Sequence, residues 1–522
     1  MAVAWMTSDQ LIEAVKRKIS FPISQSTFTE DDVLGFANEE IAISQVPSVL
    51  VFHEEYFVAY KDVPLIDGQD RYHIPERAVG MKLRDLFWLD SAGTMFEMTR
   101  ISSDDRAFFQ RNTGAAQNLH KFYFEGNDVV LTPHLTSPTG SLRFVYFLRP
   151  NQLVRDSRAI TIKYFTKDVT VGTVNPNTLI TVGSSYYYAG TKPTITVVVP
   201  GDLVTAQETT IKINQIPFAG EYFTISSPTT DYIVWFSVNT AGITTGYAPS
   251  INGTAVEVNI DSTDSVNTVA SKLNVVFNSI AGPDFVSTVL LDTVTVDSAS
   301  FGACVNAANS SNVYFAIDPS SSVTAANIQV AISGNSNLSS VAQLTATPTI
   351  LRLYYVVQTL PITSSDVSIV VQSTQGIEAT SDIPSNFTVG FKVDFIQSNP
   401  GFKTRGMDVL IPIGGISVTN LILSSSDIPS DLVVGDYINS QYEAIVPQIP
   451  ADLHHGLAER TAARILAALG DRDGLAVVND KIKEIEMRQG NMMDNRAEGA
   501  PQKITARHSL LRYGKTGTIR RY

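Results

Sequence analysis

Few side chains of this sequence have the spacing that a catalytic or metal-binding site requires. His454 and His455 are adjacent, so on a helix they point about 100° apart and cannot both bind one metal ion, as an i, i+4 pair could. The stretch GDRDGL begins like a calcium loop at Asp471, but its twelfth position is Ile482, where a bidentate Glu is required. We therefore expect exposed or partly buried bundle histidines, and a helix-helix turn at Asp471.

Cys304 is the only cysteine and lies in ASFGAC, which resembles a nucleophile's surroundings. The segment around it contains no histidine, so no local base could activate the thiol. The chain has no G-x-x-x-x-G-K-[ST], no G-x-G-x-x-G after a strand and no G-x-S-x-G. We expect a small buried cysteine, no cofactor, no metal site and no enzyme activity. A glycosidase-like carboxylate pair formed across a barrel stays an open alternative.

The end of the sequence has an unusual charge. From Gly499 to Tyr522 it contains six Lys or Arg and no Asp or Glu, while the formal net charge of all 522 residues is −13. The apolar residues of this segment fit neither a helical nor a strand period, so it has no evident core face. Two interpretations remain: a frayed, solvated end, or an arm that folds on a partner.

Amphipathic helices are predicted near both ends of the sequence. Thr7 and Gln10 form a capping box, and Thr29 can cap a second helix. Apolar stripes follow these caps and recur after Pro450, with Gly470 between the last two helices. We expect helices near 8–20, 30–45, 452–469 and 474–489 to pack as one bundle.

The middle of the sequence is rich in strand patterns. Period-two segments with Asp-Gly and Gly-Asn turns begin at Glu54 and predict a small antiparallel sheet. From Ala159 to Leu351 there is no Arg, with 5 Lys against 12 Asp or Glu, but apolar residues still recur as in folded β structure. Within it, SVNTVASKLNVVFNSIAG places Val266, Val269, Ala270, Leu273, Phe277 and Ile280 on one helical face. This favours an α/β insert at about 207–318, with a plain sandwich as the alternative.

A short sequence repeat, called the sequence echo below, suggests two structurally related turns in the β structure. SDIPSNFTVGFKVDF at Ser381 returns as SDIPSDLVVGDYIN at Ser426, 45 residues later. Each copy offers a Pro turn, a Gly and a short strand, which suits two corresponding corners of one barrel or sandwich.

The predicted fold class is multidomain α+β: a terminal helical bundle, a small antiparallel sheet, inserted β-rich sandwich- or barrel-like domains with one α/β module, and an extended C-terminal arm. The expected domains are 1–50 (N-terminal bundle helices), 51–165 (antiparallel β domain), 166–347 (inserted β-rich domain), 348–447 (second β domain), 448–490 (C-terminal bundle helices) and 491–522 (arm). The first residues lack the pattern of a signal peptide, and no long apolar run occurs. We expect neither secretion nor membrane insertion, and assembly in a reducing cytoplasm.

Several blocks of the sequence, in this order, resemble head-to-tail connector (adaptor) proteins of tailed bacteriophages. They are TSDQLIEAVKRKISFPISQSTFTEDDVLGFANEEI, EEYFVAYKDVPLIDGQDRYHIPERAVGMKLRD, FYFEGNDVVLTP, LRFVYFLRPNQLV, VPQIPADLHHGLAERTAARILAALGD and PQKITARHSLLR. The resemblance covers about residues 7–157 and 366–515. The stretch AGEYFTISSPTTDYIVWFSVN also resembles a module of phage structural proteins. Small adaptors are mostly a helical bundle, a short sheet and a C-terminal arm, so this chain departs from them in its added β-rich mass.

The resemblance implies a virion protein at the head-tail junction, assembled in the cytoplasm of a bacterial host. It implies a homo-oligomeric ring, commonly of twelve copies, that docks beneath the portal protein, offers a platform to tail or nozzle proteins and lets genomic DNA pass without sequence-specific binding. The family's arm reaches into the portal, which assigns portal binding here to Lys503, Arg507, His508, Leu510, Leu511, Arg512 and Tyr513. An acidic channel would repel phosphates and let DNA slide.

A second class of function also fits the β-rich composition. A tail-fibre, baseplate or decoration protein would use β domains to bind a receptor or glycan. Fibre proteins usually trimerise through a shaft, and no heptad, collagen-like or β-helical repeat is visible.

Overall fold

The computed structural model has a multidomain α+β fold, as predicted, and the chain forms two compact units. The first unit contains Met1–Ala159, Ile396–Thr404 and Asn439–Tyr522, and the second contains Ile160–Phe395 and Arg405–Ile438. The structure describes residues 5–19, 28–52, 54–105, 121–132, 139–175, 178–202, 204–240, 243–245, 252–279, 283–310, 313–334, 341–358, 360–399 and 401–492.

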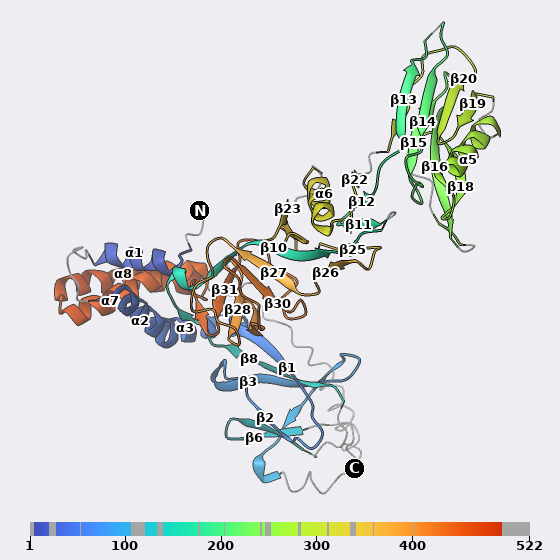
Figure 1. The fold of residues 1–522 in the computed structure, drawn as a ribbon. Coiled ribbons are helices and arrows are strands. Elements are labelled where there is room, and N and C mark those ends of the chain that lie inside the picture. Colours follow the sequence, from blue (N-terminus) through green and yellow to red (C-terminus); the bar gives the residue numbers. More distant parts are fainter. Residues whose placement is uncertain are drawn as a thin grey trace, which may run out of the picture. The chain divides into compact units, whose positions relative to one another are not determined.

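Helices of the first unit come from the two ends of the described chain, blue and red in Figure 1. They are α1 (Ser8–Lys18), α2 (Glu30–Glu40), a π-helical turn (Ile41–Gln45), α3 (Val46–Phe52), α7 (His454–Leu469) and α8 (Arg472–Met492). Thr7 begins α1 in a capping box with Gln10, and Thr29 begins α2 in a capping box with Asp32. Both predicted helix starts are therefore confirmed.

The four predicted helices pack together as one bundle, which confirms that prediction. Helix α7 contacts α1, α2 and α8. The main bundle core joins α1, α2 and α7 through buried apolar side chains, among them Leu11, Val15, Val33, Ala37, Leu457 and Ile465. Helix α8 adds a smaller cluster in which Val478 packs with Ala463 and Leu466 of α7. Leu469, the last residue of α7, is 40% exposed, so the apolar stripe of this helix is not buried to its end.

The β part of the first unit contains two four-stranded sheets instead of the one small sheet predicted. The first has the order β1-β8-β3-β4, formed by Val58–Pro64, Ser141–Leu148, Ala78–Leu89 and Met95–Glu97. The second has the order β2-β7-β6-β5, formed by Arg71–His73, Asp128–Thr132, Lys121–Glu125 and Thr99–Arg100. They share one core around Tyr72, Phe144 and Tyr146. A minor pair joins β9 (Gln152–Leu153) to β32 (Glu443–Ala444).

The second unit is organised around one long strand, β10 (Ile160–Val171). It pairs with β24 (Ile350–Tyr355), β26 (Ile369–Val371), β27 (Gln375–Ala379) and β31 (Tyr437–Ser440). The same sheet includes β23 (Val341–Leu344), β28 (Lys392–Ile396), β29 (Thr404–Leu410) and β30 (Asn420–Leu423). A four-stranded sheet and a helix share its core: β22 (Val313–Phe315), β12 (Ser185–Ala189), β11 (Leu179–Val182), β25 (Ile362–Ser364) and α6 (Ser321–Ser333).

The two copies of the sequence echo occupy matching places in this sheet. Each copy contains a turn that a backbone hydrogen bond to the proline carbonyl stabilises. The N–H of Phe387 donates to Pro384, and the N–H of Leu432 donates to Pro429. A glycine with positive φ then precedes the strand in both copies. The two strands, β28 and β31, are neighbours in the sheet order. The echo therefore marks two corresponding corners, as its pattern indicated.

A module within the second unit has its own core of strands and one helix. One sheet consists of β13 (Thr194–Val199), β14 (Glu208–Lys212), β20 (Thr293–Ser298) and β19 (Phe285–Leu290). The other consists of β17 (Ile243–Thr245), β16 (Asp231–Thr240), β15 (Tyr222–Ser226), β21 (Ala308–Asn309) and β18 (Thr254–Asp261). Helix α5 (Val266–Ser279) buries Val269, Ala270, Leu273 and Phe277, as predicted, so the plain-sandwich alternative is wrong.

The predicted limits of the β-rich insertion fall within paired structure. Position 166 lies inside β10, and position 347 lies between β23 and β24, two strands that pair with each other. The ends of the α/β module lie together instead, because the Asn309 side chain donates to the Pro193 carbonyl at 2.7 Å. The module therefore enters and leaves the rest of the unit at one place.

We predict that the α/β module can be removed without unfolding the second unit. Replacing residues 193–309 by a short Gly-Ser bridge should leave soluble protein, because β10 and its partner strands remain intact. Deleting residues 166–347 should instead give aggregated protein, because half of β10 and all of β23 are lost. Circular dichroism and size-exclusion chromatography distinguish these outcomes; aggregation of the shorter deletion would show that the module belongs to the main core.

Candidate functional site

The residues predicted to bind the portal lie outside the described residues. These are Lys503, Arg507, His508, Leu510, Leu511, Arg512 and Tyr513. The described element that leads toward them is α8, which ends at Met492. The described residues nearest in sequence to the predicted portal-binding segment are therefore those of α8, which packs on α7.

The turn between α7 and α8 sets the direction of α8 relative to α7. Gly470 ends α7 with a φ of 77°, in the left-handed region that favours glycine. The Asp471 carboxylate then accepts the backbone N–H of Gly474 at 3.0 Å, at the start of α8. The GDRDGL stretch is thus a helix-helix turn, as predicted.

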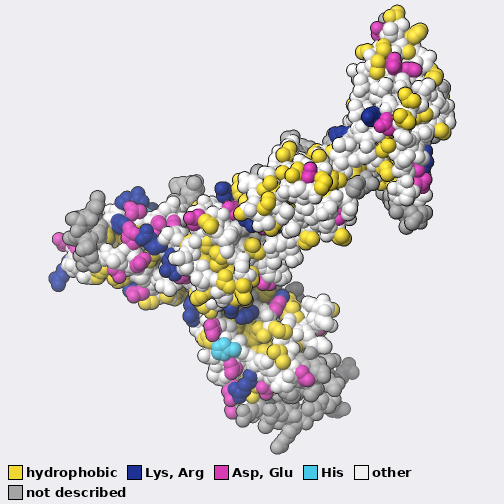
Figure 2. Space-filling view, in the orientation of Figure 1, with side chains coloured by type: hydrophobic (Ala, Val, Ile, Leu, Met, Phe, Trp, Pro, Cys, Tyr) yellow, Lys and Arg dark blue, Asp and Glu magenta, His cyan; other side chains and the backbone are white. Residues whose placement is uncertain are grey.

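Much of α8 is exposed, and its charges are mixed in sign. Val477 and Met487 are 59% and 69% exposed, although they are apolar. Lys483 pairs with Asp480, and Arg488 pairs with Glu484. Figure 2 shows the same interspersed Lys or Arg and Asp or Glu side chains over the helical region. This surface suits contact with protein and lacks the continuous positive face of a nucleic-acid binder.

Ion pairs connect α7 to the other helices of the bundle. The Arg464 side chain of α7 contacts Glu39, at 2.8 Å, and Glu40 of α2. Glu459 of α7, of which only 3% is exposed, pairs with Lys18 of α1. Because Glu40 and Glu459 are buried, loss of either partner would leave a charge without compensation between the helices.

A second bond network holds the start of α1. The Arg155 guanidinium contacts the Asp9 carboxylate at 2.6 Å and also pairs with Glu30 of α2. The next residue, Asp156, accepts the hydroxyl of Thr7 at 2.6 Å, and burial raises the pKa of its carboxyl. The segment after β9 therefore fastens α1 and α2 together.

His454 is fully buried, which corrects the expectation of exposed or partly buried histidines for this residue. Its Nδ1 accepts the backbone N–H of Met6 at 3.1 Å, and its Nε2 lies 3.1 Å from the Pro447 carbonyl. The ring therefore uses one nitrogen as acceptor and one as donor, as neutral imidazole does. Burial lowers the pKa of His454 to about 4. His455 is exposed, with 59% of its side chain accessible, as the expectation allowed, and the desolvation it does undergo lowers its pKa.

Phe402 packs between two rings of the same unit. Its ring stacks on His454 with centroids 5.4 Å apart, and the ring of Trp5 lies 5.5 Å away on centroids. Phe402 has a φ of 40°, which costs about 1 kcal/mol or more for a residue that is not glycine. Burial of the whole aromatic ring offsets this strain.

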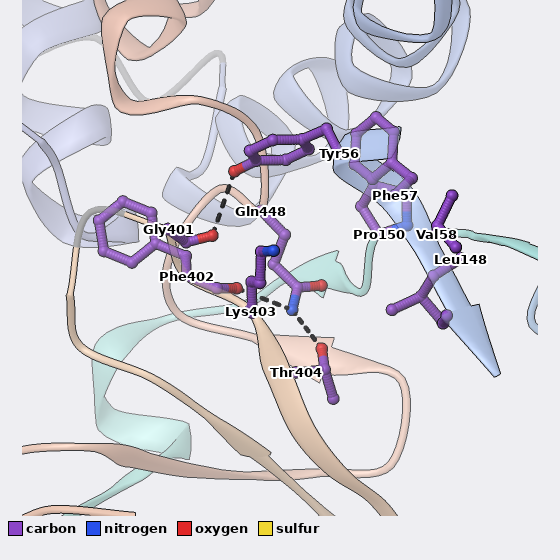
Figure 3. A pocket seen from close by; sticks show the side chains of 11 residues that line it. Tyr56, Phe57, Val58, Leu148, Pro150, Gly401, Phe402, Lys403, Thr404 and Gln448 are labelled. Atoms are coloured by element: carbon purple, nitrogen blue, oxygen red, sulfur yellow. Dashed lines mark hydrogen bonds between the residues drawn. The ribbon is translucent and has the colours of Figure 1, made fainter. Parts of the chain in front are cut away.

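A cavity of about 70 Å³ lies next to this cluster, lined by Tyr56, Phe57, Val58, Ala59, Leu148, Pro150, Gly401, Phe402, Lys403, Thr404 and Gln448. Figure 3 shows the Gln448 amide donating to the hydroxyl of Thr404, at 2.6 Å, and the hydroxyl of Tyr56 donating to the Gly401 carbonyl, at 3.1 Å. Ligand pockets usually enclose about 300 to 1,000 Å³. The cavity is therefore too small for a cofactor, and its polar groups hold the 401–404 segment in place.

The other residues considered for chemistry are not assembled into a site. Cys304 is half-buried, not fully buried as expected, because it lies in a loop next to Gly302, whose carbonyl its Sγ contacts at 3.5 Å. Burial raises the pKa of its thiol, so the reactive thiolate is disfavoured. Among the described residues, no group of His, Cys, Asp or Glu could hold a metal ion, and no helix is long and apolar enough to cross a membrane.

Sequence patterns located the bundle but missed its central aromatic contact. Nothing in the stretch around Phe402 distinguishes it from an ordinary Pro-Gly turn, and its partner His454 is 52 positions away. Comparison of the chain with models of protein families and with curated proteins finds no match.

We predict that His454 makes the first unit sensitive to acid. The pKa of His454 is about 4 when folded and about 6.5 when unfolded, so below about pH 6.5 the unfolded chain binds the extra proton. The free energy of unfolding should therefore fall by about 2 to 3 kcal/mol as the pH is lowered from about 7 to about 4.5. Urea unfolding followed by helical circular dichroism measures this change.

The matched control is His454→Gln, which cannot take up the proton. Its unfolding free energy should be lower than wild type near neutral pH, but should show a smaller decrease toward acid. Equal pH dependence in both proteins would contradict the assignment of this effect to His454.

Proposed function

We propose that this chain is a structural protein of a tailed-bacteriophage virion, the adaptor ring at the head-tail junction. The proposal rests on the resemblance of its flanking segments to head-to-tail connectors. The observation that supports it best is the bundle: helices from both ends of the chain pack together around α7, and α8 leads toward the basic arm. Small adaptors have this same order of bundle helices followed by an arm.

In the proposed role, the arm docks into the portal protein above the ring. The chain beyond α8 is 30 residues long and spans at most about 100 Å when fully extended. Leu510, Leu511 and Tyr513 would gain a core face on the portal, and Arg507 and Arg512 would form charge-assisted bonds with acidic groups there. The ionic part of this contact weakens as salt is added.

The rest of the molecule would form the ring and its platform. Mixed charges on the helical surface, with exposed Val477 and Met487, suit contacts between copies in a ring of about twelve. The net charge of −13 would repel phosphates, so genomic DNA could pass without being held. The β domains would face tail or nozzle proteins.

A fibre, baseplate or decoration protein is the competing function for a chain with this much β structure. The two functions differ in oligomeric state and in partner. Native mass spectrometry of the purified chain, with and without the portal protein of its phage, separates them. Higher-order rings that bind portal support the adaptor; a stable trimer that ignores portal supports the fibre.

We predict that truncation before Gly499 abolishes attachment to portal and leaves folding nearly unchanged. The double variant Arg507→Glu with Arg512→Glu should weaken attachment less severely, because the apolar residues of the arm remain. Cosedimentation with portal at increasing salt measures both effects, and wild-type attachment should weaken as salt rises.

The control carries the same charge change at two exposed lysines of the second unit, away from the bundle helices, as Lys163→Glu with Lys392→Glu. This control should attach like wild type. Normal attachment by the truncated protein would show that the basic segment is a solvated end with no partner.

A further inference from the structure

Helix α5 lies beside two edge strands of the α/β module, β18 and β19 (Figure 1). Among the described residues, side chains of α5 bond to the backbone of β19 but not to that of β18. On β19, the Asn278 side chain accepts the backbone N–H of Ser287 at 3.0 Å and donates to the carbonyl of the same residue at 2.9 Å. The amide of Asn278 thus replaces a neighbouring strand at this point. Along β18, the side-chain bond of this kind found within the described residues is at the last residue, where the Asp264 side chain accepts the N–H of Asp261; none is found there at Glu257 or Asn259.

Two hydrogen bonds at the end of β18 show in which direction its backbone groups point. The N–H of Ser262 donates to Asn239 of β16, so the even-numbered residues of β18 face β16. The N–H of Asp261 donates instead to the Asp264 side chain, on the other side. Backbone groups alternate along a strand, so those of Glu257 and Asn259 point away from β16. Among the described residues they have no strand partner.

A groove lies where these free groups point. Its volume is about 430 Å³, within the usual range for ligand sites, and it runs between β18 and α5. One wall is formed by Glu257, Val258 and Asn259, and the other by α5 residues, of which Val275 is 61% exposed. The groove therefore combines an apolar wall with backbone donors and acceptors that no described strand pairs.

The charge of the groove is negative. Lys272 is the cation on its wall, and it is bonded to Asp261 at 2.9 Å and to Asp264 at 2.7 Å. Lys272 is thus neutralised by two carboxylates beside the groove, and Glu257 on the groove wall has no ion-pair partner within the described part of the chain. A Lys or Arg side chain from a binding partner would supply the positive charge that Glu257 lacks.

We propose that the outer edge of β18 binds an extended segment of another protein, which adds to the sheet as a strand and places a Lys or Arg near Glu257. Main-chain bonds to Glu257 and Asn259 supply affinity, and contacts of alternate side chains with Val275 and Glu257 supply specificity. This site is independent of the arm, and the inference does not require the adaptor function.

A second copy of this chain is a poorer occupant of the same edge. Pairing of β18 with another β18 would bring a second Glu257 and a second Asp261 to an edge that is already acidic, and like charges across a strand pair are destabilising. An exposed edge with acidic side chains is protected against such self-pairing. The charge argument therefore favours a basic segment from a different protein.

The test uses the full chain and a fluorescently labelled short peptide that alternates Val and Lys. Fluorescence anisotropy should show saturable binding. A peptide with Glu in place of Lys, and one with its strand-pairing nitrogens methylated, should each bind about tenfold more weakly or not at all. Failure of the Val-Lys peptide to saturate would overturn the proposal, and would leave the charges of β18 as protection against aggregation only.

Variants locate the binding on β18. Glu257→Lys reverses the groove charge, and Asn259→Pro removes one outward N–H that the sheet does not use; each should weaken binding of the Val-Lys peptide about tenfold. Val275→Gln removes the apolar wall of the exposed helix face without adding charge, and it should weaken binding too, which keeps the test decisive if the proline variant fails to fold. Val286→Lys, an exposed position of β19, is the matched control and should bind like wild type.

Two further outcomes would contradict the proposal. Equal binding by wild type and Glu257→Lys would place the peptide elsewhere. Tighter binding of a peptide with the sequence Gly499–Tyr522 than of the Val-Lys peptide would make this chain's own arm the occupant, in place of another protein.

Discussion

The packing of α7 against α1 and α2 is the contact on which the first unit depends, and it joins parts of the chain that are far apart in sequence. Glu40 and Arg464, which pair across this contact, are 424 positions apart. Closing so long a loop has an entropic cost that grows slowly with length, and the buried apolar core of the three helices offsets it. The β-rich chain between them is therefore held at both ends.

Buried charge and buried rings give this packing its specificity. Removing one partner of a buried ion pair typically costs about 3 to 5 kcal/mol, because the other charge is left without compensation. Glu459 with Lys18 and Glu40 with Arg464 therefore disfavour other ways of packing these helices. His454 adds a requirement of the same kind, since it stays neutral and bonds Met6 with one nitrogen while it stacks on Phe402. Each of these contacts joins α7 to a segment from another part of the sequence.

Local signals in the sequence were enough to predict the bundle and the α5 helix, but not the long-range contacts. Capping boxes at Thr7 and Thr29 and apolar stripes depend on residues a few positions apart, so a single sequence displays them. Helix α6 was missed, although Ala325, Ile328 and Ile332 have helical spacing, because its Ser- and Asn-rich segment was interpreted as β structure. The predicted limits of the inserted domain fall within paired structure because β10 is long enough to pair with β24 through its second half and with β31 through its first residues. The strained backbone of Phe402 has no local signature at all.

The central claim is that helices from the two ends of the chain fold as one cooperative unit. Hydrogen exchange under native conditions tests it through Leu457→Ala, which removes a fully buried side chain of α7 and should cost about 2 to 5 kcal/mol. The account predicts that amides of α1 and α2 lose the same protection free energy as those of α7, while amides of α5 keep theirs. Unchanged protection in α1 and α2 would show that the two ends of the chain are stabilised separately, which would contradict the account.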